Sequence, residues 1–268
     1  MNTPSILQRT ALLSILIFAA LGGPAMAAIQ TRTIEYQAGD TPCIGYLAWD
    51  DASHAIRPGV IIVHEFWGLN EYAKRRAREI AELGYVGFAI DMYGNGKVAA
   101  TREEAGALAG TVRNDPAVRD LRLKAAYDTF CSQPEVDATH IGAMGYCFGG
   151  SMALQLAYNG LPLAGVVSFH GSLPVPTAEE SARLTMPILI CHGADDPIKT
   201  LVEFKAAMAA CDADMVFTEY ANAVHAFTNP DSGNDNSKGA AYNEKADKRS
   251  WRQMKQWWKE CFGIPMKE

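Results

Sequence analysis

The chain has 268 residues, of which 49% are hydrophobic and 20% charged, and its formal net charge is −6. This length suits one sizeable α/β domain, and the composition is that of an ordinary globular protein. Charges of both signs are interspersed without a basic stripe, which argues against nucleic acid as a partner. The six cysteines contain no C-x-x-C pair, so their spacing fits no zinc site.

The first 27 residues are predicted to be a secretory signal peptide. Residues 11–23 form an apolar run that is short for a bilayer span, and a small-x-small cleavage pattern ends at Ala27. We expect cleavage after Ala27, a single mature domain over residues 28–268, and a periplasmic or secreted location. No later stretch is long and apolar enough to predict a membrane span.

Short apolar runs alternate with helical patterns after residue 30. The runs at 32–36 and 43–48 alternate apolar and polar residues, as antiparallel edge strands do. Apolar runs typical of buried strands follow at 59–65, 85–91, 141–146, 163–169, 187–192 and 215–220. Helical patterns are predicted at 70–83, within a longer polar stretch at 100–132, and at 148–159, 200–211 and 238–260. The polar segment 231–239 is predicted to be a surface loop.

This alternation predicts an α/β fold with a mostly parallel, doubly wound sheet and helices on both faces. The antiparallel strands at the start resemble the α/β-hydrolase variant of that fold.

Cys147 lies at the centre of the sharpest motif, Gly-Tyr-Cys-Phe-Gly-Gly at residues 145–150. The motif follows a predicted strand and opens a predicted helix, as a G-x-nucleophile-x-G elbow does, with cysteine in place of serine. Such a tight turn needs small residues two positions before and after the nucleophile. It holds the sulfur at a helix N-terminus, where the helix dipole and free N–H groups favour a thiolate and an oxyanion. We therefore predict that Cys147 is a nucleophile rather than a buried structural cysteine.

Partners for Cys147 follow in the order acid, then histidine. Asp195 and Asp196 come directly after the strand predicted at 187–192, where the acid of a triad belongs. Either aspartate could serve. The H-G-x-x-D spacing favours Asp196 and leaves Asp195 as a turn or capping residue. Among the six histidines, His225 alone follows the acid in sequence, so we predict it as the base.

Three other histidines have different predicted roles. His170 and His192 end strands and could line the site, although a structural role is favoured for each. His64 precedes Glu65, but the fifth residue of that motif is Gly68, which excludes an H-E-x-x-H zinc site. No metal and no organic cofactor is expected.

Four motifs together resemble the dienelactone hydrolase family. They lie at 64–70 (HEFWGLN), 145–150 (GYCFGG), 192–197 (HGADDP) and 224–227 (VHAF), and the strand end at 91–93 (DMY) also fits. They span essentially the whole mature chain. The first motif combined with the second is specific for this family.

The resemblance implies a role for each matching residue. Cys147 would be the nucleophile, His225 the general base and then acid, and Asp196 the residue that orients the histidine. Backbone N–H groups of Phe66 and Phe148 would form the oxyanion hole.

The resemblance also implies a fourth participant, Glu65. Its carboxylate would accept the thiol hydrogen bond at rest and help to ionise the thiol when substrate arrives. A thiol that is neutral at rest resists oxidation, which matters outside the cytoplasm. The predicted side chains of the substrate pocket are those of Trp67, Tyr93, Asn95 and Asn229.

Two departures from the family pattern concern the substrate. Asn95 and Asn229 stand where family members that cleave dienelactone carry two arginines for the substrate carboxylate. Asparagine supplies no charge and no bidentate fork, so we expect a neutral substrate unless another cation, such as Lys97, reaches the pocket. The predicted export signal is the second departure, because dienelactone catabolism is expected in the cytoplasm.

The sequence thus predicts a cysteine-dependent hydrolase of small esters or lactones that works through an acyl-enzyme. A thioester or a carbon–carbon bond substrate stays open within that class. The alternative is a non-catalytic or redox-responsive small-molecule binding protein on the same scaffold, because a fold does not fix function. Neither the physiological substrate nor the oligomeric state follows from the sequence.

Overall fold

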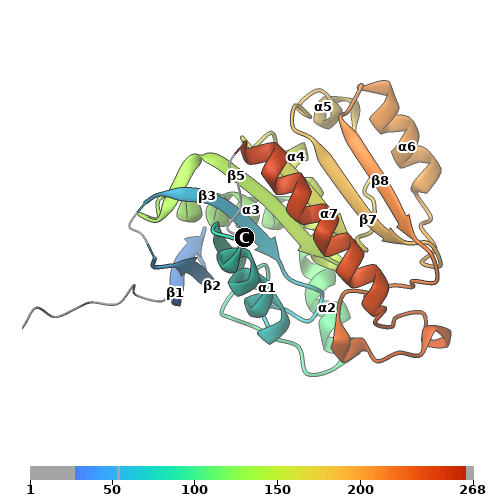
Figure 1. Cartoon of the computed structure of the whole chain (residues 1–268), viewed down its shortest axis with the longest axis horizontal. Coiled ribbons are helices and arrows are strands. Elements are labelled where there is room, and N and C mark those ends of the chain that lie inside the picture. The colour runs from blue at the N-terminus through green and yellow to red at the C-terminus, as the bar shows by residue number, and fades with distance from the viewer. Residues whose placement is uncertain (1–27, 53–54, 264–268) are drawn as a thin grey trace, which may run out of the picture.

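The computed structural model describes residues 28–52 and 55–263. These residues contain one eight-stranded sheet with the strand order β1-β2-β4-β3-β5-β6-β7-β8 (Figure 1). The hairpin of β1 (Ile29–Ala38) and β2 (Thr41–Asp50) is antiparallel and pairs with β4 in the antiparallel sense. The remaining neighbours pair in parallel. The predicted signal peptide, residues 1–27, lies outside the described residues.

The elements alternate along the chain as expected. The further strands are β3 (Arg57–Val63), β4 (Val86–Ile90), β5 (Val136–Tyr146), β6 (Gly165–Phe169), β7 (Ile188–Gly193) and β8 (Met215–Tyr220). The helices are α1 (Glu71–Glu82), α2 (Arg102–Arg113), α3 (Pro116–Cys131), α4 (Phe148–Tyr158), α5 (Ala178–Ser181), α6 (Leu201–Ala210) and α7 (Glu244–Phe262).

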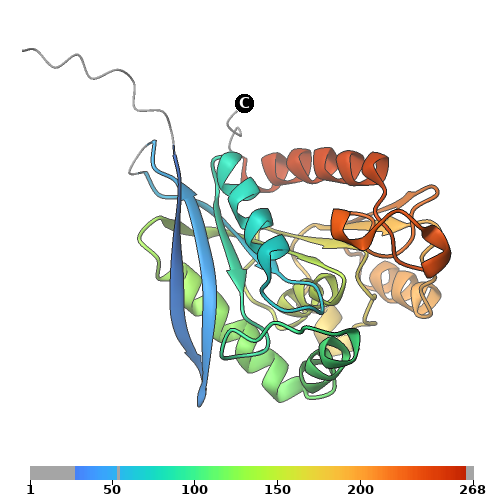
Figure 2. The same cartoon turned by 90° about the horizontal axis from the view of Figure 1, so that it is seen from below.

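Helices cover both faces of the sheet, each over its own apolar core. Helices α1 and α7 pack on one face, and α3, α4 and α6 pack on the other (Figure 2). The predicted α/β-hydrolase fold, a mostly parallel doubly wound sheet with helices on both faces, is confirmed. None of the helices in the described part of the chain is long and apolar enough to cross a membrane.

Two predicted boundaries differ from the structure. The stretch at 100–132 forms two helices because Pro116 starts a new one, with the Asp115 side chain accepting from the Val118 amide as N-cap. The last helix begins at Glu244 rather than near residue 238. The preceding chain instead forms two short 3₁₀ helices, Pro230–Ser232 and Asn236–Lys238.

Candidate active site

Cys147 sits in a strained turn between β5 and α4. Its backbone has φ 55° and ψ −118°, a conformation that L-residues rarely adopt. A Cβ on Gly145 would lie 2.0 Å from the carbonyl oxygen of Gly149, and one on Gly149 would lie 2.1 Å from that of Val63. Only glycine fits at either position, so these two residues permit the sharp turn that presents the Cys147 side chain at the end of the sheet.

A continuous series of hydrogen bonds joins Cys147, His225 and Asp196. His225 Nε2 lies 3.0 Å from Cys147 Sγ, and His225 Nδ1 lies 2.8 Å from Asp196 Oδ2. His192 donates from Nε2 to the Asp196 carbonyl at 2.9 Å and so supports that loop. Asp195 is exposed to solvent. The structure therefore brings together Cys147, His225 and Asp196, the three side chains that the sequence singled out.

The contacts of His225 favour its charged form. Burial opposes that charge, but the hydrogen bonds to Asp196 and Cys147 outweigh burial and raise the pKa of His225 to about 10. These contacts favour a positive charge on the imidazole beside the sulfur. A positive charge at this distance stabilises a thiolate, which is the nucleophilic form of cysteine.

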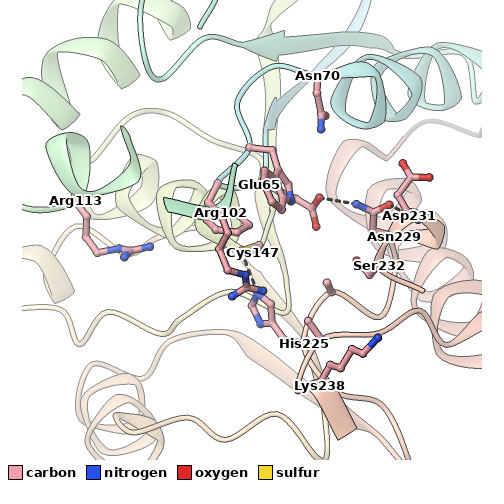
Figure 3. Close-up of a pocket in the computed structure, with 14 residues that line it drawn as sticks. Glu65, Asn70, Arg102, Arg113, Cys147, His225, Asn229, Asp231, Ser232 and Lys238 are labelled. Atoms are coloured by element: carbon pink, nitrogen blue, oxygen red, sulfur yellow. Dashed lines mark hydrogen bonds between the residues drawn. The ribbon is translucent and has the colours of Figure 1, made fainter. Parts of the chain in front are cut away.

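Glu65 lies just beyond β3 and is almost completely buried, with 3% of its surface exposed. Asn229 Nδ2 donates to Glu65 Oε2 at 2.7 Å (Figure 3). Burial raises the pKa of Glu65 to about 7, although the Asn229 hydrogen bond and the charges of His225 and Arg76 oppose this rise. Among the described residues, no hydrogen bond joins Glu65 to Cys147. The predicted resting contact between the two is therefore absent, and the Cys147 sulfur lies within hydrogen-bond distance of His225 Nε2 instead.

A cavity of about 520 Å³ opens over Cys147. Figure 3 shows Arg113 on one side of it, with Asn229, Asp231 and Lys238 on the other. The lining residues are Glu65, Phe66, Trp67, Asn70, Arg102, Arg113, Cys147, His225, Ala226, Asn229, Asp231, Ser232, Lys238 and Ala240. The polar segment 231–239 thus contributes to the cavity wall and is more than a surface loop. No group of three or more His, Cys, Asp or Glu side chains in the described ranges could hold a metal ion.

Comparison with known proteins decides the family. The sequence profile of the dienelactone hydrolase family matches residues 44–262. The chain belongs to the dienelactone hydrolase family. It is therefore a hydrolase of the dienelactone hydrolase type, and the resemblance inferred from the motifs is confirmed.

Individual relatives agree with this assignment. A solved structure named m3DLH is 36% identical, with a TM-score of 0.84, over 87% of this chain and 99% of its own. The dienelactone hydrolase-like promiscuous phosphotriesterase P91, from metagenomic libraries, is 37% identical with a TM-score of 0.83, over 90% and 100% of the two chains. A protein of Saccharolobus solfataricus, provisionally named a carboxymethylenebutenolidase, is 27% identical over 73% of this chain and 86% of its own.

In this member of the family, two residues predicted for the substrate pocket do not line the cavity. Asn95 is exposed in a turn with φ 57°, and its backbone N–H donates to the Pro42 carbonyl, so the chain after β4 turns away from the site. Lys97, the predicted replacement cation, is exposed in the same turn and does not line the cavity either. Tyr93 is buried behind the wall, where its hydroxyl donates to the Phe66 carbonyl at 2.9 Å.

A different contact bears on the predicted oxyanion hole. The Phe66 N–H shares its peptide plane with the Glu65 carbonyl, which accepts from His64 Nδ1 at 2.6 Å and from the Gly68 N–H at 3.2 Å. Phe148 is the first residue of α4, where a backbone N–H has no acceptor within its own helix. Both amides are therefore suited to an oxyanion, and the role itself stays a prediction.

Arg102 and Arg113 line the cavity, although the motifs did not indicate them. They lie at opposite ends of α2, eleven residues apart, which is close to three full turns and so places them on one helix face. The guanidinium of Arg102 lies 5.6 Å from the centre of the Phe66 ring, and that of Arg113 lies 5.8 Å from the Phe148 ring. This helical spacing is the one sequence signal that could have pointed to them.

Replacing Glu65 with glutamine should stabilise the protein at alkaline pH. The folded-state pKa of Glu65, about 7, lies above the ordinary value of 4.5, so folding binds a proton. Below pH 4.5 the carboxyl is protonated in both states and costs nothing. As the pH rises from about 4.5 to 7, the wild type loses on the order of 3 kcal/mol of unfolding free energy that the neutral variant keeps.

Chemical denaturation at pH 5 and pH 8 measures this difference. The Glu65→Gln variant should exceed the wild type at pH 8, and the gap should shrink strongly at pH 5. Glu103→Gln, at an exposed position of α2, is the matched control for the loss of one carboxylate. An equal gap at both pH values would mean that Glu65 does not titrate in this range.

Proposed function

We propose that this chain hydrolyses small esters or lactones through a covalent acyl-enzyme on Cys147. The observation that carries the proposal is the hydrogen-bonded series Asp196–His225–Cys147, which ends at a strained elbow beneath an open cavity. Nucleophile, base and orienting acid are the three parts that acyl transfer needs, and here they are mutually within hydrogen-bond distance.

The proposed reaction has two halves. In the first, the Cys147 thiolate attacks the carbonyl carbon, and the N–H groups of Phe66 and Phe148 stabilise the oxyanion. The tetrahedral intermediate collapses to a thioester as the C–O bond breaks, and His225 gives its proton to the leaving oxygen. In the second half, His225 takes a proton from water, which attacks the thioester and releases the carboxylic acid and Cys147.

Turnover of a small panel by the purified protein tests this proposal. The panel contains aryl and alkyl esters, unsubstituted lactones, and one neutral phosphotriester, since the relative P91 is described as a phosphotriesterase. The Cys147→Ala variant serves as the blank. Turnover absent across the panel, together with tight binding of a panel member, would favour the binding-protein alternative.

We further propose that the substrate carries an ionised acidic group away from the bond that is broken. Arg102 and Arg113 make no ion pair with the described residues, and they face the cavity from one helix. The side-chain amide of Asn229, in contrast, already donates a hydrogen bond to the Glu65 carboxyl group. The expectation of a neutral substrate held only if no other cation reached the pocket, and Arg102 and Arg113 of α2 line it.

The anion preference is measurable with a matched pair of substrates, an ester carrying a remote carboxylate and its neutral methyl ester. We expect kcat/KM to favour the anion by about tenfold, and the double variant Arg102→Gln, Arg113→Gln to lose most of that preference. Both side chains are solvent-exposed, so added salt should weaken the preference as well. Arg249→Gln, on α7 and outside the cavity, is the control. A wild-type preference for the neutral ester would contradict the proposal.

The periplasmic or secreted location stays a prediction. Fractionation of cells that express the full chain, followed by N-terminal sequencing of the mature protein, tests both the location and the cleavage after Ala27.

A further inference from the structure

His170 is a buried histidine that the proposed reaction does not use. It follows β6, is fully inaccessible to solvent, and has a left-handed backbone with φ 39°. The backbone N–H of Cys147 donates to His170 Nδ1 at 3.1 Å and to the Phe169 carbonyl at 3.0 Å. The imidazole therefore contacts the strained peptide of the nucleophile itself.

This contact fixes the tautomer of His170. Because Nδ1 accepts from Cys147, the ring proton must lie on Nε2, which is 2.7 Å from Thr228 Oγ1 and donates to it. Thr228 lies three residues after His225. One imidazole thus joins the turn that holds the sulfur to the loop that holds the base.

The Thr228 end of this connection is itself anchored. The Tyr72 hydroxyl lies 2.7 Å from Thr228 Oγ1, and Arg76 Nη2 donates to the Thr228 carbonyl at 2.9 Å. Arg76 is in turn paired with Asp247 of α7 at 2.9 Å. The loop after β8 is therefore held against α1 at the point where His170 reaches it.

The site also keeps His170 neutral. Burial, followed by the nearby charges of His225 and His192, lowers its pKa well below the ordinary value. The His170 ring meets the His225 ring edge-on, with centroids 5.2 Å apart. A second proton would point Nδ1–H at the Cys147 N–H and place a cation beside the His225 imidazolium. The titratable or charged groups around His170 are Cys147, His225, His192, Arg76 and Tyr146, and Tyr72 contacts Thr228 beside it.

We propose that His170 is a positioning residue for the nucleophile. Its Nδ1 lone pair holds the strained Cys147 peptide, its Nε2–H holds the loop that carries His225, and together they set the distance between sulfur and imidazole. The proposal rests on the proposed role of Cys147. His170 does not line the cavity over Cys147, so it acts through Cys147 and His225.

Two substitutions separate the two ends of the imidazole. His170→Asn keeps an acceptor near the Nδ1 position and tolerates the left-handed backbone. His170→Gln places its amide near the Nε2 position and leaves the Cys147 N–H without that acceptor. Thr228→Val is a third variant that removes the acceptor of the Nε2–H and keeps the side-chain shape.

The readout is the pH dependence of Cys147 alkylation by iodoacetamide, followed by peptide mapping so that the other cysteines do not contribute. A looser pair of sulfur and imidazolium stabilises the thiolate less, so the alkylation midpoint should move to higher pH in His170→Gln and in Thr228→Val. Their kcat should fall by about tenfold or more with KM little changed. His170→Asn removes the same Nε2–H contact as Thr228→Val, so its midpoint should match that of Thr228→Val and its kcat should lie within about threefold of that variant's.

Two results would overturn the proposal. One is a wild-type alkylation midpoint in folded His170→Gln or Thr228→Val. An unchanged midpoint together with a lower melting temperature is what a purely structural role would give. The other is a wild-type midpoint and kcat in His170→Asn when Thr228→Val is impaired, because both variants remove the Nε2–H contact. Alkylation needs no substrate, so a failed ester assay would count against the proposed function and leave this test intact.

Discussion

Replacing Cys147 with alanine should lower kcat for any ester substrate by at least about a thousandfold. The methyl group cannot form the thioester, and the remaining N–H groups can only polarise a carbonyl for attack by water. The rest of the site should persist, because the strained turn depends on Gly145 and Gly149 rather than on the sulfur. The far-ultraviolet circular dichroism spectrum should therefore be unchanged.

Cys211→Ala is the matched control for this experiment. Cys211 is a partly exposed cysteine at the end of α6, outside the cavity. Its loss should leave kcat within about threefold of wild type. If Cys147→Ala keeps more than about a tenth of wild-type activity, the nucleophile lies elsewhere.

Two kinds of site residue could be predicted from the sequence. Some lie in a local motif, and others follow successive strands of the sheet in chain order. Cys147 lies in a local motif whose glycines are required by contacts within the same turn. Asp196 and His225 follow strands β7 and β8, and the carboxyl ends of parallel strands meet at one edge of the sheet. The strand at 215–220 also matches its predicted bounds, because the residues that predict it are contiguous in the sequence.

The cavity wall could not be predicted in the same way. Arg102 and Arg113 reach the site only because α2 packs beside the loops after β3 and β5, and nothing near them in the sequence records that packing. Likewise, Glu65 and Asn229 are 164 residues apart, and their hydrogen bond depends on how the chain after β8 folds back. Asn95 was placed in the pocket by its position after a motif, but the turn that follows β4 points outward.

His225→Ala should abolish hydrolysis, with a loss of about a thousandfold or more in kcat, because both halves of the proposed reaction move a proton through its Nε2. Asp196→Asn should cost on the order of a hundredfold to ten-thousandfold. The carboxylate 2.8 Å from Nδ1 stabilises the imidazolium and holds the ring toward Cys147. An amide supplies no charge there, and it can present an N–H that forces the wrong tautomer.

Asp195→Asn is the control that makes this test decisive. Asp195 differs from its neighbour by one position in the chain, but its side chain is exposed while that of Asp196 is 13% exposed and hydrogen-bonded to His225. The Asp195→Asn substitution should leave kcat within about threefold of wild type.

The pKa of His225 gives a second readout. Burial lowers that pKa, but the contacts with Asp196 and Cys147 raise it. Asp196→Asn should therefore lower the pKa of His225, and the NMR titration of His225 should move to lower pH. A larger loss of kcat from Asp195→Asn than from Asp196→Asn, or an unmoved His225 titration in Asp196→Asn, would show that the hydrogen bond at 2.8 Å does not orient the base.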